Sequence, residues 1–306
     1  MRKTRSDNQR GRAPNPHPKL FPNWPEQLPD IVEELKLKRP SDPIWTEHKA
    51  KLVERYLYYF VLVTRHGIYL DGFAGPQEPN KPDTWAARLA LKSKPMFLTN
   101  FFLCERNRQK LKAVRKLKLE ADHDSEREQV KRQIHVLRGD FNLTVDKILS
   151  PANIPENRAT FALLDQRTFE CHWKTVKKLA SYRVPPANKI ELFYFLATGW
   201  LHRSLSGIKK SAQKVSNWFG SENWQSLKDA SRDDIRDLFT RRFREDLGYK
   251  HVHPWPIYDR REAGGVMYYM IHATDHDEAP KLMARAYARA LKRREKPEQF
   301  KLELGL

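Results

Sequence analysis

Short apolar runs alternate with stretches of helical spacing through the first two-thirds of this 306-residue chain. The runs have the length of strands that are buried on both faces, and the stretches between them repeat apolar residues every three or four positions. Because crossover connections of this kind place successive strands in parallel, the pattern predicts an α/β fold with a mostly parallel sheet covered by helices. The runs lie at residues 68–70, 101–104, 134–137, 161–164 and 190–196.

An amphipathic helix is predicted just before the first run. Leu52, Val53, Tyr56 and Phe60 recur at the spacing of one helix face. The polar residues interleaved with this face are His48, Lys49, Lys51, Glu54 and Arg55.

The alternation stops after residue 197. Residues 198–248 keep helical spacing around aromatic anchors such as Trp218 and Trp224, which predicts a helical insertion. Two strand-like runs, 252–258 and 266–273, then flank a segment containing Gly264 and Gly265, which is typical of an antiparallel hairpin. Residues 280–294 are typical of a basic helix.

We divide the chain into four segments on these patterns. Residues 1–43 are rich in proline and basic side chains and are predicted to be a flexible arm. Residues 44–197 hold the first part of the sheet, and residues 198–248 are the helical insertion, a candidate substrate lobe. Residues 249–306 complete the domain with the hairpin and the basic helix.

The chain is strongly basic. Lys and Arg number 57 against 38 Asp and Glu, which gives a formal net charge of +19 and favours a polyanionic partner, most simply nucleic acid. No apolar stretch approaches the ~20 residues of a membrane-spanning helix, and no signal-like apolar run opens the chain. With only two cysteines and no disulfide framework, we expect a protein of the reducing cytoplasm that does not meet a membrane.

An acid follows each of the first four apolar runs. Asp71 opens the segment Asp71-Gly72-Phe73-Ala74-Gly75, and Glu105, Asp140 and Asp165 follow the later runs. The carboxyl ends of parallel strands meet at one edge of a sheet, where α/β proteins bind ligands. Any one such acid is most often a helix cap or a turn residue, so the shared register of all four is what favours a ligand site.

The positions of these residues suit a nucleoside with a cationic end. Gly72 and Gly75 allow close backbone approach, and Glu105 is placed like an acid that holds ribose hydroxyls. Asp140 is placed to accept from an adenine amine, and Asp165 is expected nearest the reacting group.

The pattern is similar to that of class I S-adenosylmethionine-dependent methyltransferases, and the chain most closely resembles the three-Cys-motif partner family. The match covers roughly residues 45–290, and its most specific part is 164–173. The residues that carry it are Trp45, Lys49, Tyr56, 69–75, 102–105, Gly139, Asp140, 164–171, Trp173 and 189–194.

The resemblance implies a Rossmann-like class I methyltransferase sheet with S-adenosylmethionine as cofactor. It also implies a partner with a three-cysteine motif that looks like a radical S-adenosylmethionine iron–sulfur protein. Residues 44–197 are then the cofactor-binding part. The implied cofactor-binding residues are Asp71, Gly72, Phe73, Gly75, Glu105 and Asp140, and Asp165 and Phe169 are the implied catalytic residues at the methyl acceptor.

The acceptor segment departs from the pattern of base N-methyltransferases. In those enzymes Pro-Pro and an aromatic residue follow the acid, whereas here Gln166-Arg167-Thr168-Phe169 follow Asp165. Pro76, Pro79 and Pro82 also lengthen the first loop. These departures keep open a second interpretation, a non-catalytic subunit that binds nucleic acid on a methyltransferase scaffold. A nuclease is a weaker third interpretation, because no paired carboxylate and lysine signature accompanies the acids.

Cations next to aromatic residues suit a nucleic-acid strand with unstacked bases. Such a cluster precedes Trp218 and Trp224 in the insertion, and a purely structural insertion is an equally good interpretation. The candidate nucleic-acid-binding residues are Arg167, Arg203, Lys209, Lys210 and Lys214.

The remaining reactive residues suggest less. Cys171 is expected to be a buried, inert thiol in the helix after Asp165. Glu191, in an apolar run, is either a structural partner of a basic side chain or a second site acid. No histidine has metal-ligand spacing, so no metal is expected.

Overall fold

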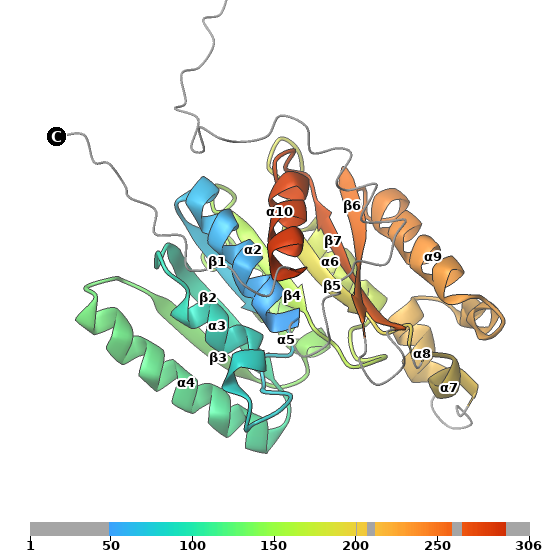
Figure 1. Ribbon diagram of the computed structural model, residues 1–306, viewed down its shortest axis with the longest axis horizontal. Helices are drawn as coiled ribbons and strands as arrows, with labels where there is room; N and C mark the ends of the chain where they lie inside the picture. The colour runs from blue at the N-terminus through green and yellow to red at the C-terminus, as the bar shows by residue number, and fades with distance from the viewer. Residues whose placement is uncertain (1–48, 200, 207–211, 259–264, 292–306) are drawn as a thin grey trace, which may run out of the picture.

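The computed structural model describes residues 49–199, 201–206, 212–258 and 265–291, and one seven-stranded sheet organises them (Figure 1). The basic arm 1–43 lies outside these residues. The strands are β1 (Gly67–Asp71), β2 (Leu98–Glu105), β3 (Gln133–Arg138), β4 (Thr160–Leu164), β5 (Glu191–Leu196), β6 (His251–Tyr258) and β7 (Val266–Thr274).

The strand order is β3-β2-β1-β4-β5-β7-β6. The first five strands pair in parallel, while β7 runs antiparallel to β5 and β6 runs antiparallel to β7. The prediction of a mostly parallel sheet that ends in an antiparallel hairpin is therefore confirmed. The predicted turn at Gly264 lies largely outside the described residues, which resume at Gly265. The order reverses direction between β1 and β4, so the carboxyl ends of β1, β2, β3 and β4 surround this switch point.

Helices cover both faces of the sheet (Figure 1). On one face lie α2 (Lys49–Thr64), α3 (Ala86–Lys92), α4 (Arg108–Arg127) and α10 (Ala279–Leu291), with the short 3₁₀ helix η2 (Pro82–Thr84) before α3. On the other face lie α5 (Phe141–Ile148), α6 (Trp173–Ser181) and the helices between β5 and β6. Every residue of β1, β4 and β5 is buried, which is why these strands are continuous apolar runs in the sequence.

Side chains alternate between the two layers along each strand. Tyr69 and Phe161 belong to the core under α2 and α10, whereas Leu70 and Leu164 belong to the core under α5 and α6. The strand period of two residues therefore builds two apolar cores from one set of short runs.

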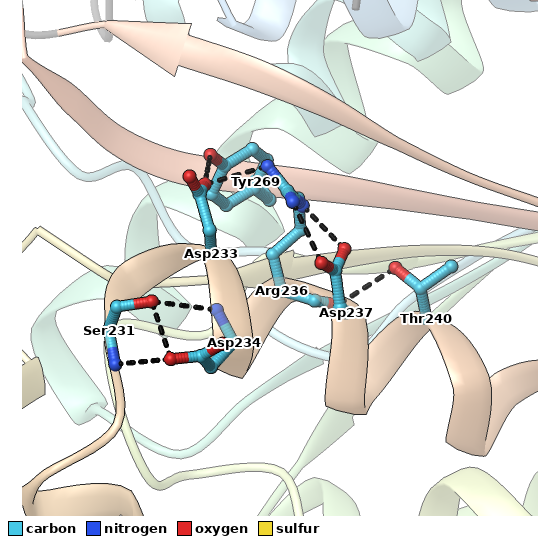
Figure 2. A network of polar contacts seen from close by, with 7 residues as sticks. All are labelled: Ser231, Asp233, Asp234, Arg236, Asp237, Thr240 and Tyr269. Atoms are coloured by element: carbon cyan, nitrogen blue, oxygen red, sulfur yellow. Dashed lines mark hydrogen bonds and ion pairs between the residues drawn. The ribbon is translucent and has the colours of Figure 1, made fainter.

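The described residues between β5 and β6 form four helices. They are α7 (Leu201–Ser206), α8 (Ala212–Phe219), the 3₁₀ helix η3 (Glu222–Lys228) and α9 (Arg232–Glu245). A network of polar contacts ties the start of α9 to β7 (Figure 2). Ser231 forms a capping box with Asp234, and the Tyr269 hydroxyl on β7 donates to Asp233 at 3.1 Å.

Candidate functional site

A cleft of about 140 Å³ lies at the carboxyl ends of β1 to β4. Three of the four strand-terminal acids line it, and Asp71 lies beneath it as a buried residue. The structure therefore brings the predicted acids to one edge of the sheet. The lining residues are Gly72, Phe73, Gly75, Gln77, Glu105, Arg106, Asn107, Lys110, Gly139, Asp140, Phe141, Asp165, Arg167 and Glu170.

Asp71 stabilises the loop that follows β1 through a hydrogen bond to its backbone. Its Oδ1 accepts from the Phe73 amide at 2.9 Å, and its Oδ2 accepts from the Tyr69 hydroxyl at 3.0 Å. Burial raises the pKa of Asp71 to about 7; the two hydrogen bonds oppose this rise, and the charges of Asp165 and Glu105 add to it. Asp71 therefore supports the loop from below and presents no carboxylate to the cleft lining.

The glycines of this loop are required by close approach. A Cβ on Gly72 would lie 2.8 Å from the Phe141 ring, and a Cβ on Gly75 would lie 2.0 Å from Glu105 Oε2. The loop is held between strands, because Gly72 N donates to Leu163 O at 3.1 Å and Ala74 N donates to Cys104 O at 2.9 Å. The absence of a side chain at Gly72 and Gly75 therefore lets this loop pack closely against Phe141 and Glu105 and hydrogen-bond to β2 and β4.

Glu105, the last residue of β2, is fixed by backbone donors. Its Oε2 accepts from Gly75 N at 3.0 Å, and its Oε1 accepts from Asn107 N at 2.7 Å. Each ionised carboxylate oxygen has about two acceptor positions, so each oxygen of Glu105 keeps one for a ligand donor.

Asp140 caps α5 and also accepts a hydrogen bond from the side chain of Asn142. Its Oδ1 accepts from the backbone amide of Asn142 at 2.8 Å and from the Asn142 side chain at 2.7 Å. Within the described residues its Oδ2 has no recorded hydrogen bond. Asp140 is thus both the helix cap that an isolated acid often is and a lining residue of the cleft.

Asp165 is held by two side chains from distant parts of the chain. Lys49 Nζ lies 2.6 Å from Asp165 Oδ1, and Gln77 Nε2 donates to Oδ2 at 2.9 Å. Lys49 is buried, with its Nζ 5.0 Å from the centre of the Phe195 ring and 5.1 Å from that of Tyr268. Asp165 is therefore a positioned carboxylate, although both of its oxygens already accept a hydrogen bond.

Hydrogen bonds within the segment after Asp165 hold it in a compact turn. Gln166 Oε1 accepts from the amides of Glu170 and Cys171, at 3.1 and 2.9 Å. Phe169 is buried and packs edge-to-face on Trp218, with ring centroids 4.9 Å apart. Phe169 is absent from the cleft lining. The resemblance places Phe169 at the methyl acceptor, whereas in the structure its ring belongs to the core between this segment and α8.

Cations stand at the rim of the cleft. Arg106 pairs with Glu170 at 2.8 Å, while Lys110 and Arg167 line the cleft with no recorded carboxylate partner in the described residues. Burial lowers the pKa of Lys110, and the neighbouring charge of Arg167 lowers it further. Of the insertion cations, Lys214 is exposed on α8 and is not among the residues that line the cleft.

The other insertion cations are not placed in this site. Lys209 and Lys210 lie outside the described residues, as does the side chain of Arg203. Their predicted role in nucleic-acid binding stays a prediction.

The chemistry of the cleft suits a nucleoside. Glu105 offers acceptors to a diol, Asp140 Oδ2 offers one to an amine, and Phe73 and Phe141 supply ring surface beside them. The loop at Gly75 and Glu105 are in such close contact that no side chain would fit between them. A ribose held by Glu105 would therefore lie beside a bare backbone, as close approach demands.

Sequence reasoning missed several members of this site. Lys49, Gln77, Arg106, Lys110 and Glu170 were not singled out as site residues. The available signal was strongest for Lys49, which stands three and seven positions before Leu52 and Tyr56 and so shares the buried stripe of α2.

Two predicted features lie elsewhere. Cys171 is buried, as expected, but it lies two residues before α6 and not within it. Burial raises the pKa of the Cys171 thiol. Burial also raises the pKa of the other cysteine, Cys104, to about 11. Glu191 lies at the opposite edge of the sheet, where β5 begins, and hydrogen-bonds to His272. It is therefore not a second acid of this cleft.

Neither metal nor membrane chemistry is indicated by the described residues. Among them, no three His, Cys, Asp or Glu side chains are grouped in a way that would hold a metal ion. Within the same part of the chain, no helix combines the length and apolar character needed to cross a membrane.

Comparison with known proteins adds no family. No protein-family model matches the chain, and no curated protein matches it significantly.

Proposed function

We propose that this chain is a class I methyltransferase-like protein that binds S-adenosylmethionine in the cleft at the carboxyl ends of β1 to β4. The observation that carries the proposal is that Glu105 and Asp140, from the ends of neighbouring strands, line one cleft with the glycine loop after β1. The strand order and the reversed β7 support it. The resemblance of the sequence to the three-Cys-motif partner family agrees with it.

Each residue has a role in this proposal. Glu105 accepts from the ribose hydroxyls, Asp140 accepts from the adenine amine, and the Gly72 to Gly75 backbone lies along the methionine end. The cofactor, when bound, supplies an electrophilic methyl group. Asp165 accepts a hydrogen bond from the methyl acceptor at the acceptor position that Gln77 leaves open on Oδ2, while Lys49 holds Oδ1 in place.

The partner in this proposal is a nucleic acid. The net charge of +19 supports a polyanionic partner, and Arg167 stands at the cleft rim where a phosphate would pass. The protein would work with an iron–sulfur partner that has a three-cysteine motif, which rests on the resemblance alone.

Calorimetric titration with S-adenosylmethionine tests the cofactor site. Glu105→Gln and Asp140→Asn keep the side-chain shape and the helix cap but exchange an acceptor for a donor, so each should weaken binding roughly tenfold or more. Glu278→Gln, an exposed residue at the start of α10, is the matched control and should bind like the wild type. Absence of binding to the folded wild-type protein would contradict the proposal.

A second candidate function is a non-catalytic subunit that positions nucleic acid for the iron–sulfur partner. The observation that favours it is that both Asp165 oxygens are engaged by the protein itself. A methyl-transfer assay on total RNA and DNA separates the candidates: transfer that Asp165→Asn abolishes supports the enzyme. Co-purification with the partner, without cofactor binding or transfer, supports the subunit.

A further inference from the structure

A second and larger cavity, of about 280 Å³, lies at the opposite edge of the sheet from the cleft. Its walls come from the last turns of α2, from the segments that lead into β4 and β5, and from the start of α10. Pockets for drug-sized ligands measure roughly 300–1,000 Å³, so this cavity suits a small metabolite.

One wall carries a buried positive charge. Arg183 is 4% exposed, and its Nη2 donates to the carbonyl oxygens of Pro155 and Arg158, at 2.9 and 2.7 Å, and to Thr160 Oγ1 at 2.9 Å. Its Nε is buried and has no hydrogen-bond partner among the described residues. Its Nη1 donates to Asn188 O at 3.4 Å, so all of its hydrogen-bond partners are neutral. Burial lowers the pKa of Arg183, and the charge of the exposed Glu156 at the cavity lining opposes this lowering. A buried cation whose hydrogen-bond partners are all neutral is unfavourable, so an incoming anion is stabilised here.

Another wall carries a buried negative charge. Glu191 is 6% exposed; its Oε1 accepts from the Tyr56 hydroxyl and lies 2.9 Å from His272 Nε2, while its Oε2 accepts from Thr274 Oγ1 at 3.1 Å. His272 carries a charge only when protonated, so no recorded partner is permanently cationic. One acceptor position on Oε2 remains for a ligand donor.

The two charges are separate features of the same cavity. No ion pair joins Arg183 to Glu191 in the described part of the chain. Of the other charged lining residues, Lys189 is paired with Asp275 at 3.2 Å, and Glu156 is exposed.

We propose that this cavity binds a small zwitterionic amino acid with an apolar side chain. The carboxylate of the ligand faces Arg183, its ammonium group faces Glu191, and its side chain packs on Phe60, Val63 and Leu282. Such a ligand gives each buried charge an opposite partner and covers the apolar wall at the same time. The proposal does not depend on the methyltransferase-like function, because the cavity and the cleft share no residue.

Calorimetric titration of the full chain with L-leucine and L-phenylalanine tests the ligand class. At least one of them should bind saturably with a dissociation constant below about 1 mM. Two analogues of phenylalanine test the two charged groups one at a time. The analogue 3-phenylpropanoate lacks the ammonium group, and 2-phenylethylamine lacks the carboxylate. Each should bind roughly tenfold more weakly than phenylalanine. No saturable binding of either amino acid at about 10 mM, or equal affinity for a single-charge analogue, would overturn the proposal.

Variants of the lining locate the binding. Val63→Trp fills the cavity and should abolish amino-acid binding, whereas Val63→Leu is the matched control and should retain it. Glu191→Gln should weaken phenylalanine binding and leave 3-phenylpropanoate unchanged. If Glu191→Gln does not fold, the two Val63 variants decide. Binding that survives Val63→Trp in a folded protein overturns the site, and titration with S-adenosylmethionine reports on the cleft separately.

Discussion

Asp71 shows how a single buried acid couples this fold to pH. It lies beneath the cleft with Tyr69 and Phe73 as partners, and burial raises its pKa to about 7. In the unfolded chain the pKa of an aspartate is about 3.9. The folded protein therefore keeps a proton that the unfolded chain releases, and the free energy of unfolding falls as the pH rises from about 4 to about 7.

Asp71→Asn should remove this part of the pH dependence. The amide is neutral at every pH, and its oxygen still accepts from Phe73 while its NH₂ group faces the Tyr69 hydroxyl. Relative to the wild type, the variant should gain stability between about pH 4 and about pH 7, by about 1.4 kcal/mol for each unit of pKa shift removed. Urea denaturation across this range measures the difference, with the exposed Asp229→Asn as control. Parallel profiles for wild type and Asp71→Asn would contradict the assignment.

Sequence reasoning located the strand-terminal acids but not their partners. An acid that follows a buried strand must lie at the carboxyl edge, so local pattern and sheet topology suffice for Asp71, Glu105, Asp140 and Asp165. The Lys49–Asp165 pair spans 116 positions, and no local pattern encodes such a contact. The sequence analysis assigned Lys49 to the polar, solvent-facing side of the predicted helix. Its spacing from Leu52 and Tyr56 in fact places it on the buried side of α2.

At the scale of elements, Asn142 joins α5, which begins at the cleft, to the start of α6. Its Nδ2 donates to Asp140 Oδ1 and to Glu170 O, at 2.7 and 2.8 Å. Its Oδ1 accepts from His172 N and Thr175 Oγ1, both at 2.8 Å. One buried amide thus connects the cap of α5 with the segment that leads into α6. The strands and the hairpin could be predicted from apolar periodicity alone. The Asn142 link and the burial of Phe169 could not, because both depend on tertiary packing.

Asn142→Ala should loosen both helices together. It removes a helix-to-helix link and leaves buried groups of the segment before α6 without a partner, at a cost of roughly 2–4 kcal/mol in the free energy of unfolding. Asn153→Ala is the matched control, because Asn153 donates to Lys147 O at 3.0 Å in an exposed position, and it should cost less than about 1 kcal/mol. Urea denaturation compares the two. Equal losses for both variants would show that Asn142 has no special role.

At the scale of the whole molecule, the net charge of the chain and the charges that line the cleft differ. The chain carries +19, yet the cleft lining holds the carboxylates of Glu105, Asp140, Asp165 and Glu170 beside its cations. In the proposed function, long-range attraction of a polyanion and local recognition of a nucleoside would therefore fall to separate groups. In the segment before α6, burial lowers the pKa of His172; the charge of Asp140 opposes this lowering, and the charges of Lys174 and Lys214 add to it.

The salt dependence of nucleic-acid binding tests which part of the protein surface a bound RNA contacts. If it passes over Arg167 and Lys214, the double variant Arg167→Gln/Lys214→Gln should lower the slope of log K against log salt by about 1.4, because each phosphate contact on a single strand contributes about 0.7. Fluorescence anisotropy with labelled single-stranded RNA at increasing KCl measures the slope. The matched control is Lys250→Gln/Lys281→Gln, which removes the same charge from exposed lysines at the other edge of the sheet. Because those lysines lie away from the cleft, the control should keep the wild-type slope. Equal slopes for the two double variants would mean that binding follows net charge alone and that the cleft rim does not guide the strand.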